Sequence, residues 1–181
     1  SYRGRLHCRI MWAESAAASM ENTARSASAS SQSSVLPSVT STETEVAVLF
    51  ADVVGSTRLY ELLGDQRARE LIQLCVEIMR DATGRNRGTV IKTIGDEILA
   101  IFPTVDDAVN AGGEMQQDIG ARPELLVQGQ HVAIRIGCHF GPVVLEHKDI
   151  FGGSVHTANR MTSQAKAGQI ITTADSVAAL P

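Results

Sequence analysis

A buried strand that ends in an acidic residue is the feature that most constrains the fold of this chain. Residues 46–50 are continuously apolar, and Asp52 follows them closely. A strand without polar alternation is buried on both faces, so it requires layers of structure on each side of a sheet. The segment 55–57, Gly-Ser-Thr, then predicts a turn that opens a helix. The sequence therefore predicts a layered domain whose central strand delivers a carboxylate to a turn.

The rest of the folded region alternates between strand and helix patterns. Gly95-Asp96 separates two strand-like runs and predicts a β-hairpin. In chain order we expect strand 46–50, helix 66–82, strands 89–94 and 97–102, helix 106–119, a loop over 123–130, strand 132–140, a turn at Gly141-Pro142, strand 143–145, a loop over 146–153, helix 154–165, strand 170–171 and helix 174–180. This order predicts an α/β (α+β) fold with a mixed, mostly antiparallel sheet covered by helices.

Residues 1–44 differ in composition from the rest. Ser, Ala and Thr dominate from Ser15 to Thr42. Such a segment buries too little apolar surface to offset its ordering entropy, so we expect it to be disordered and the folded domain to cover 45–181. Met20 is a candidate native start, in which case the residues before it are vector sequence.

Composition narrows the classes of function. A net charge of -4, with 44% hydrophobic and 20% charged residues, is typical of an ordinary soluble domain and argues against nucleic-acid binding, which needs a basic surface. No apolar run approaches the roughly 20 residues that cross a bilayer, and no secretory signal is evident. The 3 cysteines have no metal-ligand spacing. We therefore expect a reduced, cytoplasmic protein without a membrane segment.

Two carboxylates on turns indicate a metal site. Asp52 follows a buried strand and Asp96 lies at a hairpin tip. Taken singly, each has an ordinary explanation, as a helix cap or as turn chemistry. Together they flank the turn at Gly55, whose free N–H groups would suit a phosphate. Because Mg²⁺ takes oxygen ligands and often needs only one or two protein carboxylates, the pair favours a metal-bound triphosphate.

Four segments in order carry a family pattern. They resemble the signatures of class III adenylyl and guanylyl cyclases, bacterial adenylyl cyclases in particular, and together span most of 46–180. The segments are 50–57 (FADVVGST), 92–96 (KTIGD), 135–143 (RIGCHFGPV) and 149–161 (DIFGGSVHTANRM). The resemblance implies a ferredoxin-like, palm-type cyclase domain that converts ATP to 3′,5′-cyclic AMP and pyrophosphate.

The resemblance also implies roles for individual residues. Two Mg²⁺ or Mn²⁺ ions would be bound by Asp52 and Asp96 with the carbonyl of Val53. Phosphate would be contacted at Gly55, Ser56 and Thr57, adenine would be read by Lys92 and Asp149, and Arg160 would stabilise charge on the α-phosphate. Without the motifs, Lys92, Asp149 and Arg160 would be interpreted as solvated surface residues.

Spacing suggests how the site is assembled. Lys92 lies four residues before Asp96 on one strand, about 13 Å at strand rise, so one substrate could hardly use both at close range. The family resemblance implies a head-to-tail homodimer in which Asp52 and Asp96 of one chain face Lys92, Asp149 and Arg160 of the other.

The chain departs from the family pattern at two places. His156 stands where the family has an Asn that orients the ribose, so we expect reduced or pH-sensitive activity, unless His156 only packs at the interface. The chain ends at Pro181, before the strands in which the family carries a triphosphate-binding Lys, and this predicts a truncated end. Two alternatives stay open: a diguanylate cyclase, because of Gly95-Asp96-Glu97-Ile98, or a weakly active or inactive domain that binds nucleotide and regulates a partner.

Overall fold

The central strand of the sheet is β2 (Thr42–Val53), which contains the predicted apolar run. The computed structural model describes residues 10–13 and 41–180. Ala47, Leu49 and Ala51 pack into one hydrophobic core, whereas Val48 and Phe50 pack into a second core on the opposite face. The expectation of a strand buried on both faces is therefore confirmed.

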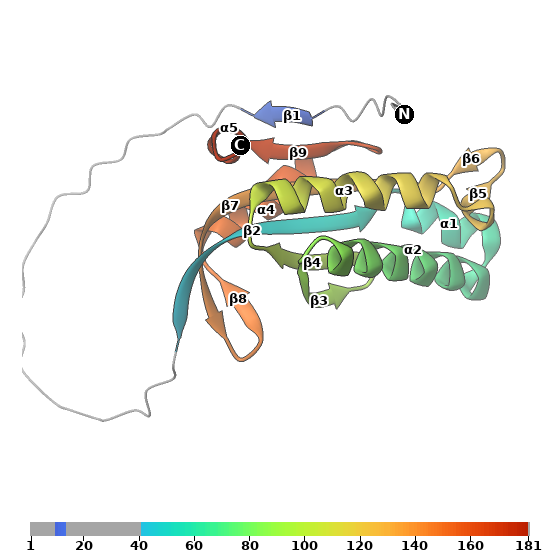
Figure 1. The fold of residues 1–181 in the computed structure, drawn as a ribbon. Coiled ribbons are helices and arrows are strands. Elements are labelled where there is room, and N and C mark those ends of the chain that lie inside the picture. The colour runs from blue at the N-terminus through green and yellow to red at the C-terminus, as the bar shows by residue number, and fades with distance from the viewer. Residues whose placement is uncertain (1–9, 14–40, 181) are drawn as a thin grey trace, which may run out of the picture.

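The main sheet has 7 strands in the order β1-β9-β7-β2-β4-β3, and β8 pairs with β7. The strands besides β2 are β1 (Ile10–Ala13), β3 (Thr89–Ile94), β4 (Glu97–Phe102), β7 (Ile134–Glu146), β8 (Asp149–Phe151) and β9 (Ile170–Thr173). Only β9 with β7 and β1 with β9 pair in parallel among these strands, so the predicted mixed, mostly antiparallel sheet is confirmed (Figure 1). A separate small hairpin consists of β5 (Leu126–Val127) and β6 (Gln130–His131).

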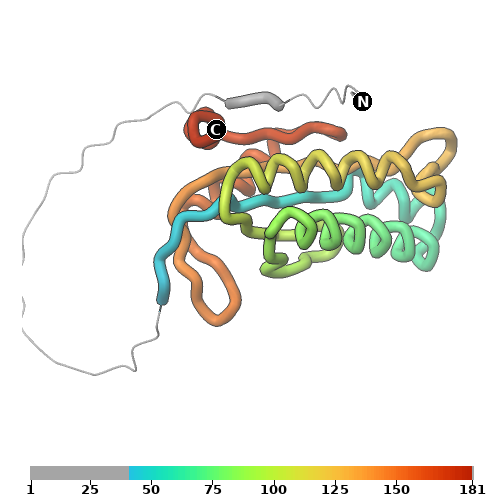
Figure 2. Tube along the Cα trace, in the orientation of Figure 1, coloured from blue at the N-terminus to red at the C-terminus, as the bar shows by residue number. Residues whose placement is uncertain are grey.

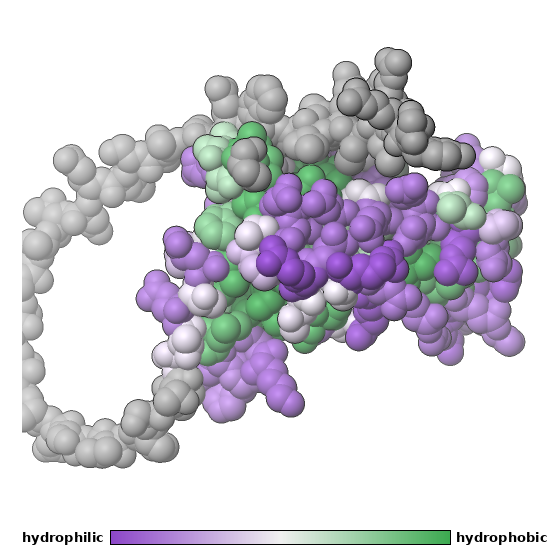
Figure 3. Space-filling view, in the orientation of Figure 1, coloured by the Kyte–Doolittle hydropathy of each residue, from purple (hydrophilic) through white to green (hydrophobic). Residues whose placement is uncertain are grey.

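Helices cover both faces of the sheet. They are α1 (Ser56–Leu63), α2 (Asp65–Arg85), α3 (Val105–Gly120), the 3₁₀ turn η1 (Pro123–Leu125), α4 (Gly153–Gln164) and α5 (Ala174–Ala178). Apolar side chains of α1, α2 and α3 enter the first core, and Ala158 of α4 enters the second. Figure 1 shows α2 and α3 side by side on the near face, and the outward side of these helices is mainly hydrophilic (Figure 3).

The turn predicted at Gly141-Pro142 is wrong. Strand β7 runs straight through it, with Gly141 opposite Val46 and Pro142 opposite Glu45. The chain reverses instead at His147 and Lys148, both at positive φ, so the predicted 146–153 loop contains β8; Figure 2 shows this hairpin projecting from the body in orange. Gly141 instead allows β7 to pack closely against α4, because a Cβ at this position would lie 2.4 Å from the Ser154 Oγ of α4.

Smaller differences concern the ends of elements. The helix start predicted at 55–57 is confirmed as the start of α1, and Gly64, at φ 76, separates α1 from α2, which contains the helix predicted over 66–82. Within the segment expected to be disordered, residues 10–13 form β1 and β2 already begins at Thr42; residues 1–9 and 14–40 lie outside the described part, as does Pro181. Over the described residues, no helix combines the length and hydrophobicity needed to span a membrane.

Candidate active site

The register of β2 with β4 brings the two predicted metal-binding carboxylates together. Asp52 lies opposite Glu97, and Asp96 occupies the turn just before Glu97. The backbone N–H of Val53 donates to the carbonyl oxygen of Asp96 at 3.3 Å, which ties the end of β2 to the hairpin tip. Gly95 takes the left-handed conformation that this tight turn requires, with φ 60.

Burial and neighbouring negative charges raise the pKa values of Asp52 and Glu97. Burial raises the pKa of Asp52, Arg135 opposes this through hydrogen bonds, and the charge of Asp96 adds to the rise. Burial also raises the pKa of Glu97, with further contributions from Asp52 and Asp96. Crowded carboxylates of this kind are stabilised by a divalent cation, and two carboxylates with a neighbouring carbonyl match the oxygen donors of Mg²⁺ or Mn²⁺. No group of three or more His, Cys, Asp or Glu side chains that could hold a metal ion occurs among the described residues.

Arg135 is a site residue that the sequence analysis did not identify. Its Nε and Nη2 donate to Oδ2 of Asp52 at 3.0 and 2.9 Å. The two residues are 83 positions apart, and only the pairing of β7 with β2 places them opposite each other. The place of Arg135 as the first residue of the third family-like segment was the signal in the sequence that could have identified it. The guanidinium therefore neutralises the candidate metal ligand in the structure.

The start of α1 offers backbone donors beside these carboxylates. Gly55 is the N-cap at φ 72, and no side chain caps the helix, which leaves N–H groups of the first turn free for a ligand. Ser56 and Asp96 line one cavity of about 510 Å³ together with Tyr60. The phosphate-binding turn and the metal-binding hairpin predicted from the sequence thus border a common space, with Thr57 exposed on the same turn.

A second group joins Lys92 of β3 to Asp149 at the start of β8. The Lys92 Nζ donates to Oδ1 and Oδ2 of Asp149 at 3.0 and 2.8 Å. Asp149 is oriented further by the N–H of Ile150, which donates to its Oδ1 at 2.8 Å. The hydrogen bond from Lys92, and then that from Ile150, lower the pKa of Asp149. The pair predicted to read a base is therefore already assembled, 57 residues apart in sequence.

A third group lies on α4. His156 and Arg160, one helical turn apart, are exposed and line a cavity of about 760 Å³ with His139. Nδ1 of His139 is 2.8 Å from Oγ1 of Thr173. Burial lowers the pKa of His139; the nearby positive charge of Arg160 lowers it further, and Asp175 partly opposes this.

Close packing sets the position of α4. Gly137 of β7 faces the helix so closely that a Cβ there would lie 2.1 Å from the backbone N of Thr162. Neither His156 nor Arg160 lines the cavity that contains Ser56 and Asp96. One chain thus presents the predicted site residues as separate groups.

Comparison with known proteins identifies the family of this chain. Residues 39–181 match the family described as "Adenylate and Guanylate cyclase catalytic domain". The chain belongs to this cyclase family. The match identifies it as a class III nucleotidyl cyclase domain and excludes the alternative that it is a diguanylate cyclase.

Individual members of the cyclase family show the same relationship. The domain is 30% identical over 124 residues to "Putative adenylate cyclase 3" of Rhizobium meliloti (68% of this chain, 21% of that protein) and 33% identical over 122 residues to "Adenylate cyclase" of Streptomyces coelicolor (66% and 30%). It thus spans a fifth to a third of these relatives. The crystal structure of the adenylyl cyclase CyaB from P. aeruginosa shares the fold, with a TM-score of 0.68 at 23% identity over 76% of this chain and 81% of that one.

Proposed function

We propose that this cyclase domain converts ATP to 3′,5′-cyclic AMP and pyrophosphate. The observation that carries the choice of ATP is the Lys92–Asp149 pair, which holds a cationic donor and an anionic acceptor side by side. Adenine presents an acceptor at ring N1 next to a donor at its N6 amine, so Lys92 can donate to the first and Asp149 can accept from the second. Guanine presents a carbonyl and a ring N–H at these positions, which reverses the pattern.

The chain's own groups fit the triphosphate end of ATP. Asp52, Asp96 and the carbonyl of Val53 would hold Mg²⁺ or Mn²⁺ ions, which when bound lower the pKa of a coordinated hydroxyl and offset phosphate charge. The first-turn amides of α1, from Gly55 onward, would donate to phosphate oxygens. Arg135, released when Asp52 binds a cation instead, would be a second cation near the triphosphate.

The bond changes are those of an intramolecular displacement. The ribose 3′-oxygen attacks the α-phosphorus, the bond from that phosphorus to the bridging oxygen breaks, pyrophosphate leaves with the electron pair, and the hydroxyl proton passes to solvent. Negative charge grows on the α-phosphate oxygens in the transition state. Arg160 would stabilise it there, because a guanidinium offers two parallel donors to a phosphoryl group. His156 would orient the ribose from one turn earlier on α4.

A homodimer would complete the site. Asp96 and the α4 residues line separate cavities of one chain, so a head-to-tail pair that places the carboxylate hairpin opposite α4 of the other chain would form two equivalent sites. Exposed apolar side chains beside the carboxylate hairpin and beside the Lys92–Asp149 pair support this assembly: Ile94, two residues before Asp96, is 54% exposed, and Phe151, two after Asp149, is 51% exposed.

The first test is product identification. Purified protein is incubated with ATP or GTP and with Mg²⁺ or Mn²⁺, and products are separated by chromatography. Cyclic AMP from ATP that disappears in an Asp52→Ala/Asp96→Ala variant supports the proposal, and cyclic GMP as the main product would overturn the choice of ATP. No cyclic product under any condition would favour the regulatory alternative, for which the His156 substitution is the specific observation.

The dimer is tested by mixing inactive variants. Asp96→Ala and Arg160→Ala are each expected to be inactive, but a heterodimer of the two would contain one site with both native groups. With random exchange of subunits, half of the dimers are heterodimers with one intact site of two, so mixing should restore about a quarter of wild-type activity. Mixing that restores nothing, although size measurements show exchange, would mean that each chain uses its own residues.

The role of His156 is tested by restoring the family's residue. We expect His156→Asn to raise the rate of cyclisation and to flatten its dependence on pH, because an amide donates a hydrogen bond without titrating. Thr157→Ala, on the same helix, is the matched control. An unchanged rate and pH profile in His156→Asn would show that His156 only packs at the interface.

A further inference from the structure

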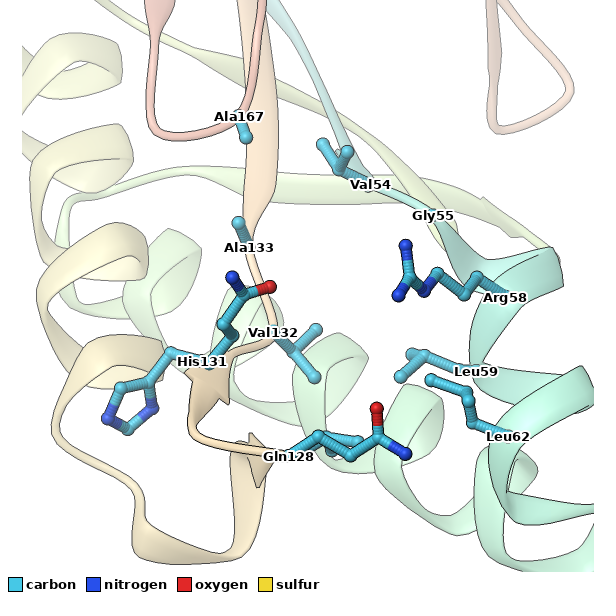
Figure 4. Close-up of a pocket in the computed structure, with 12 residues that line it drawn as sticks. Val54, Gly55, Arg58, Leu59, Leu62, Gln128, His131, Val132, Ala133 and Ala167 are labelled. Carbon is cyan, nitrogen blue, oxygen red and sulfur yellow. The ribbon is translucent and has the colours of Figure 1, made fainter.

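A cavity on the other side of α1 has no role in the proposed reaction. It encloses about 480 Å³ between α1 and the β5–β6 hairpin, a size within the range of small-molecule sites. Helical spacing directs most of it away from the phosphate side, since Ser56 and Tyr60 line the cavity that contains Asp96 whereas Arg58 and Leu62 line this one. The two sides meet at Gly55, the N-cap of α1, which also lines this cavity. Figure 4 shows Arg58 extending from α1 into the space between this helix and the segment that carries Val132 and Ala133.

The charge of this cavity is unbalanced. Arg58 lies on its wall, and no acidic residue is among those that line it. Within the described part of the chain Arg58 has no ion pair and no side-chain hydrogen bond, in contrast to Arg67 on α2, which pairs with Glu70 at 3.1 Å. A free guanidinium in a concave site is suited to a planar oxyanion, to which it donates two parallel hydrogen bonds.

The rest of the lining is suited to an apolar body. Leu59, Val132 and Ala133 form the inner wall, and Val54 and Leu62 are 36% and 41% exposed, which is high for large apolar side chains. Gln128 and Gln130 supply neutral polar groups, and His131 also lines the cavity. One fixed positive charge beside an apolar wall matches a singly charged ligand better than a dianion.

We infer that this cavity is a binding site for a small monocarboxylate with an aromatic or branched apolar body, whose carboxylate pairs with Arg58. The cavity adjoins the start of α1, and Val54 N–H donates to the carbonyl of Ala133 on the cavity wall at 2.8 Å. A bound ligand would therefore fix α1 relative to the segment before β7. Because Gly55 opens the phosphate-binding turn, we expect occupancy to change the apparent KM for ATP; this consequence, unlike binding itself, rests on the proposed function.

Binding is tested with benzoate as the probe. Ligand-observed NMR and thermal shift on the whole chain should detect benzoate with a Kd of about 1 mM, as expected for a fragment of this size. Arg58→Gln should weaken binding about tenfold or more, because it removes a charge-assisted contact, while Arg67→Gln serves as the control and should leave it unchanged. Leu62→Gln, an exposed position with little risk to folding, should also weaken binding.

Several results would overturn the inference. Benzyl alcohol, the neutral analogue, must bind more weakly than benzoate; equal binding would remove the role of Arg58. Tighter binding of phenyl phosphate would assign the site to phosphate esters instead of carboxylates. Benzoate binding that is lost in Asp52→Ala/Asp96→Ala would place the ligand in the catalytic cavity. If benzoate binds as expected but no cyclic nucleotide is formed, the proposed function fails and this site stands.

Discussion

The contact between β7 and α4 predicts a large effect from one methyl group. In Gly137→Ala the new Cβ would lie 2.1 Å from the backbone N of Thr162 and 2.6 Å from its Cα. These are backbone atoms, so the strand and the helix must separate. Overpacking costs about 1–3 kcal/mol, and a backbone clash belongs at the upper end of that range. For a domain of this size, about 3 kcal/mol lowers the melting temperature by roughly 6–12 °C.

The same substitution should also lower the rate of catalysis, because α4 carries His156 and Arg160. A shift of about 1 Å in a group that acts on the substrate costs on the order of 100-fold in rate. The matched control is Gly113→Ala in α3, where a Cβ meets nothing within 4 Å and where alanine should stabilise the helix by about 0.5–1 kcal/mol. Calorimetry and initial rates check both variants. Wild-type melting and full activity in Gly137→Ala would refute the close packing of β7 on α4.

Three further predictions follow from the charged and titratable groups. Because the pKa of His139 is lowered in the folded protein, the unfolded state binds more protons as pH falls below 6.5, and the free energy of unfolding decreases. His139→Gln should therefore reduce the loss of stability that urea unfolding measures between about pH 7 and 5.5. Arg135→Met should tighten Mn²⁺ binding to nucleotide-free protein in calorimetric titrations, because the guanidinium and the cation compete for Asp52. Lys92→Met should cost under about 1 kcal/mol of stability, since its pair with Asp149 is half-exposed, yet lower kcat/KM for ATP at least tenfold.

Local signals made much of the fold predictable. The β3–β4 hairpin follows from two strand-like runs around Gly95, and the both-sided burial of β2 follows from its unbroken apolar run. Gly141 shows where such signals fail. A glycine in a turn and a glycine beneath a crossing helix look alike in sequence, and only the tertiary contact with Ser154 distinguishes them.

The same distinction between local signals and tertiary contacts applies to the candidate site. Asp52 and Asp96 could be predicted because their positions next to a strand and a turn are local properties. The partnership of Asp52 with Arg135 could not, since it depends on the register between β2 and β7 across 83 residues. The Lys92–Asp149 contact depends likewise on where β8 folds back, and β8 itself was taken for a loop.

The charge state of the structure suggests how the proposed substrate would be accepted. Asp52 forms an ion pair with Arg135 and Asp149 forms one with Lys92, so both of these proposed site carboxylates already have partners. When metal and ATP bind, they would replace Arg135 and Lys92 as the partners of these carboxylates, so neither carboxylate would be left unpaired. This matters for the half-buried Asp52, because a partly buried charge without a partner would destabilise the protein. Arg160, like Asp96, has no ion pair within the described part of the chain. Under the proposed mechanism, that free guanidinium meets a charge that arises only in the transition state, where stabilisation accelerates the reaction.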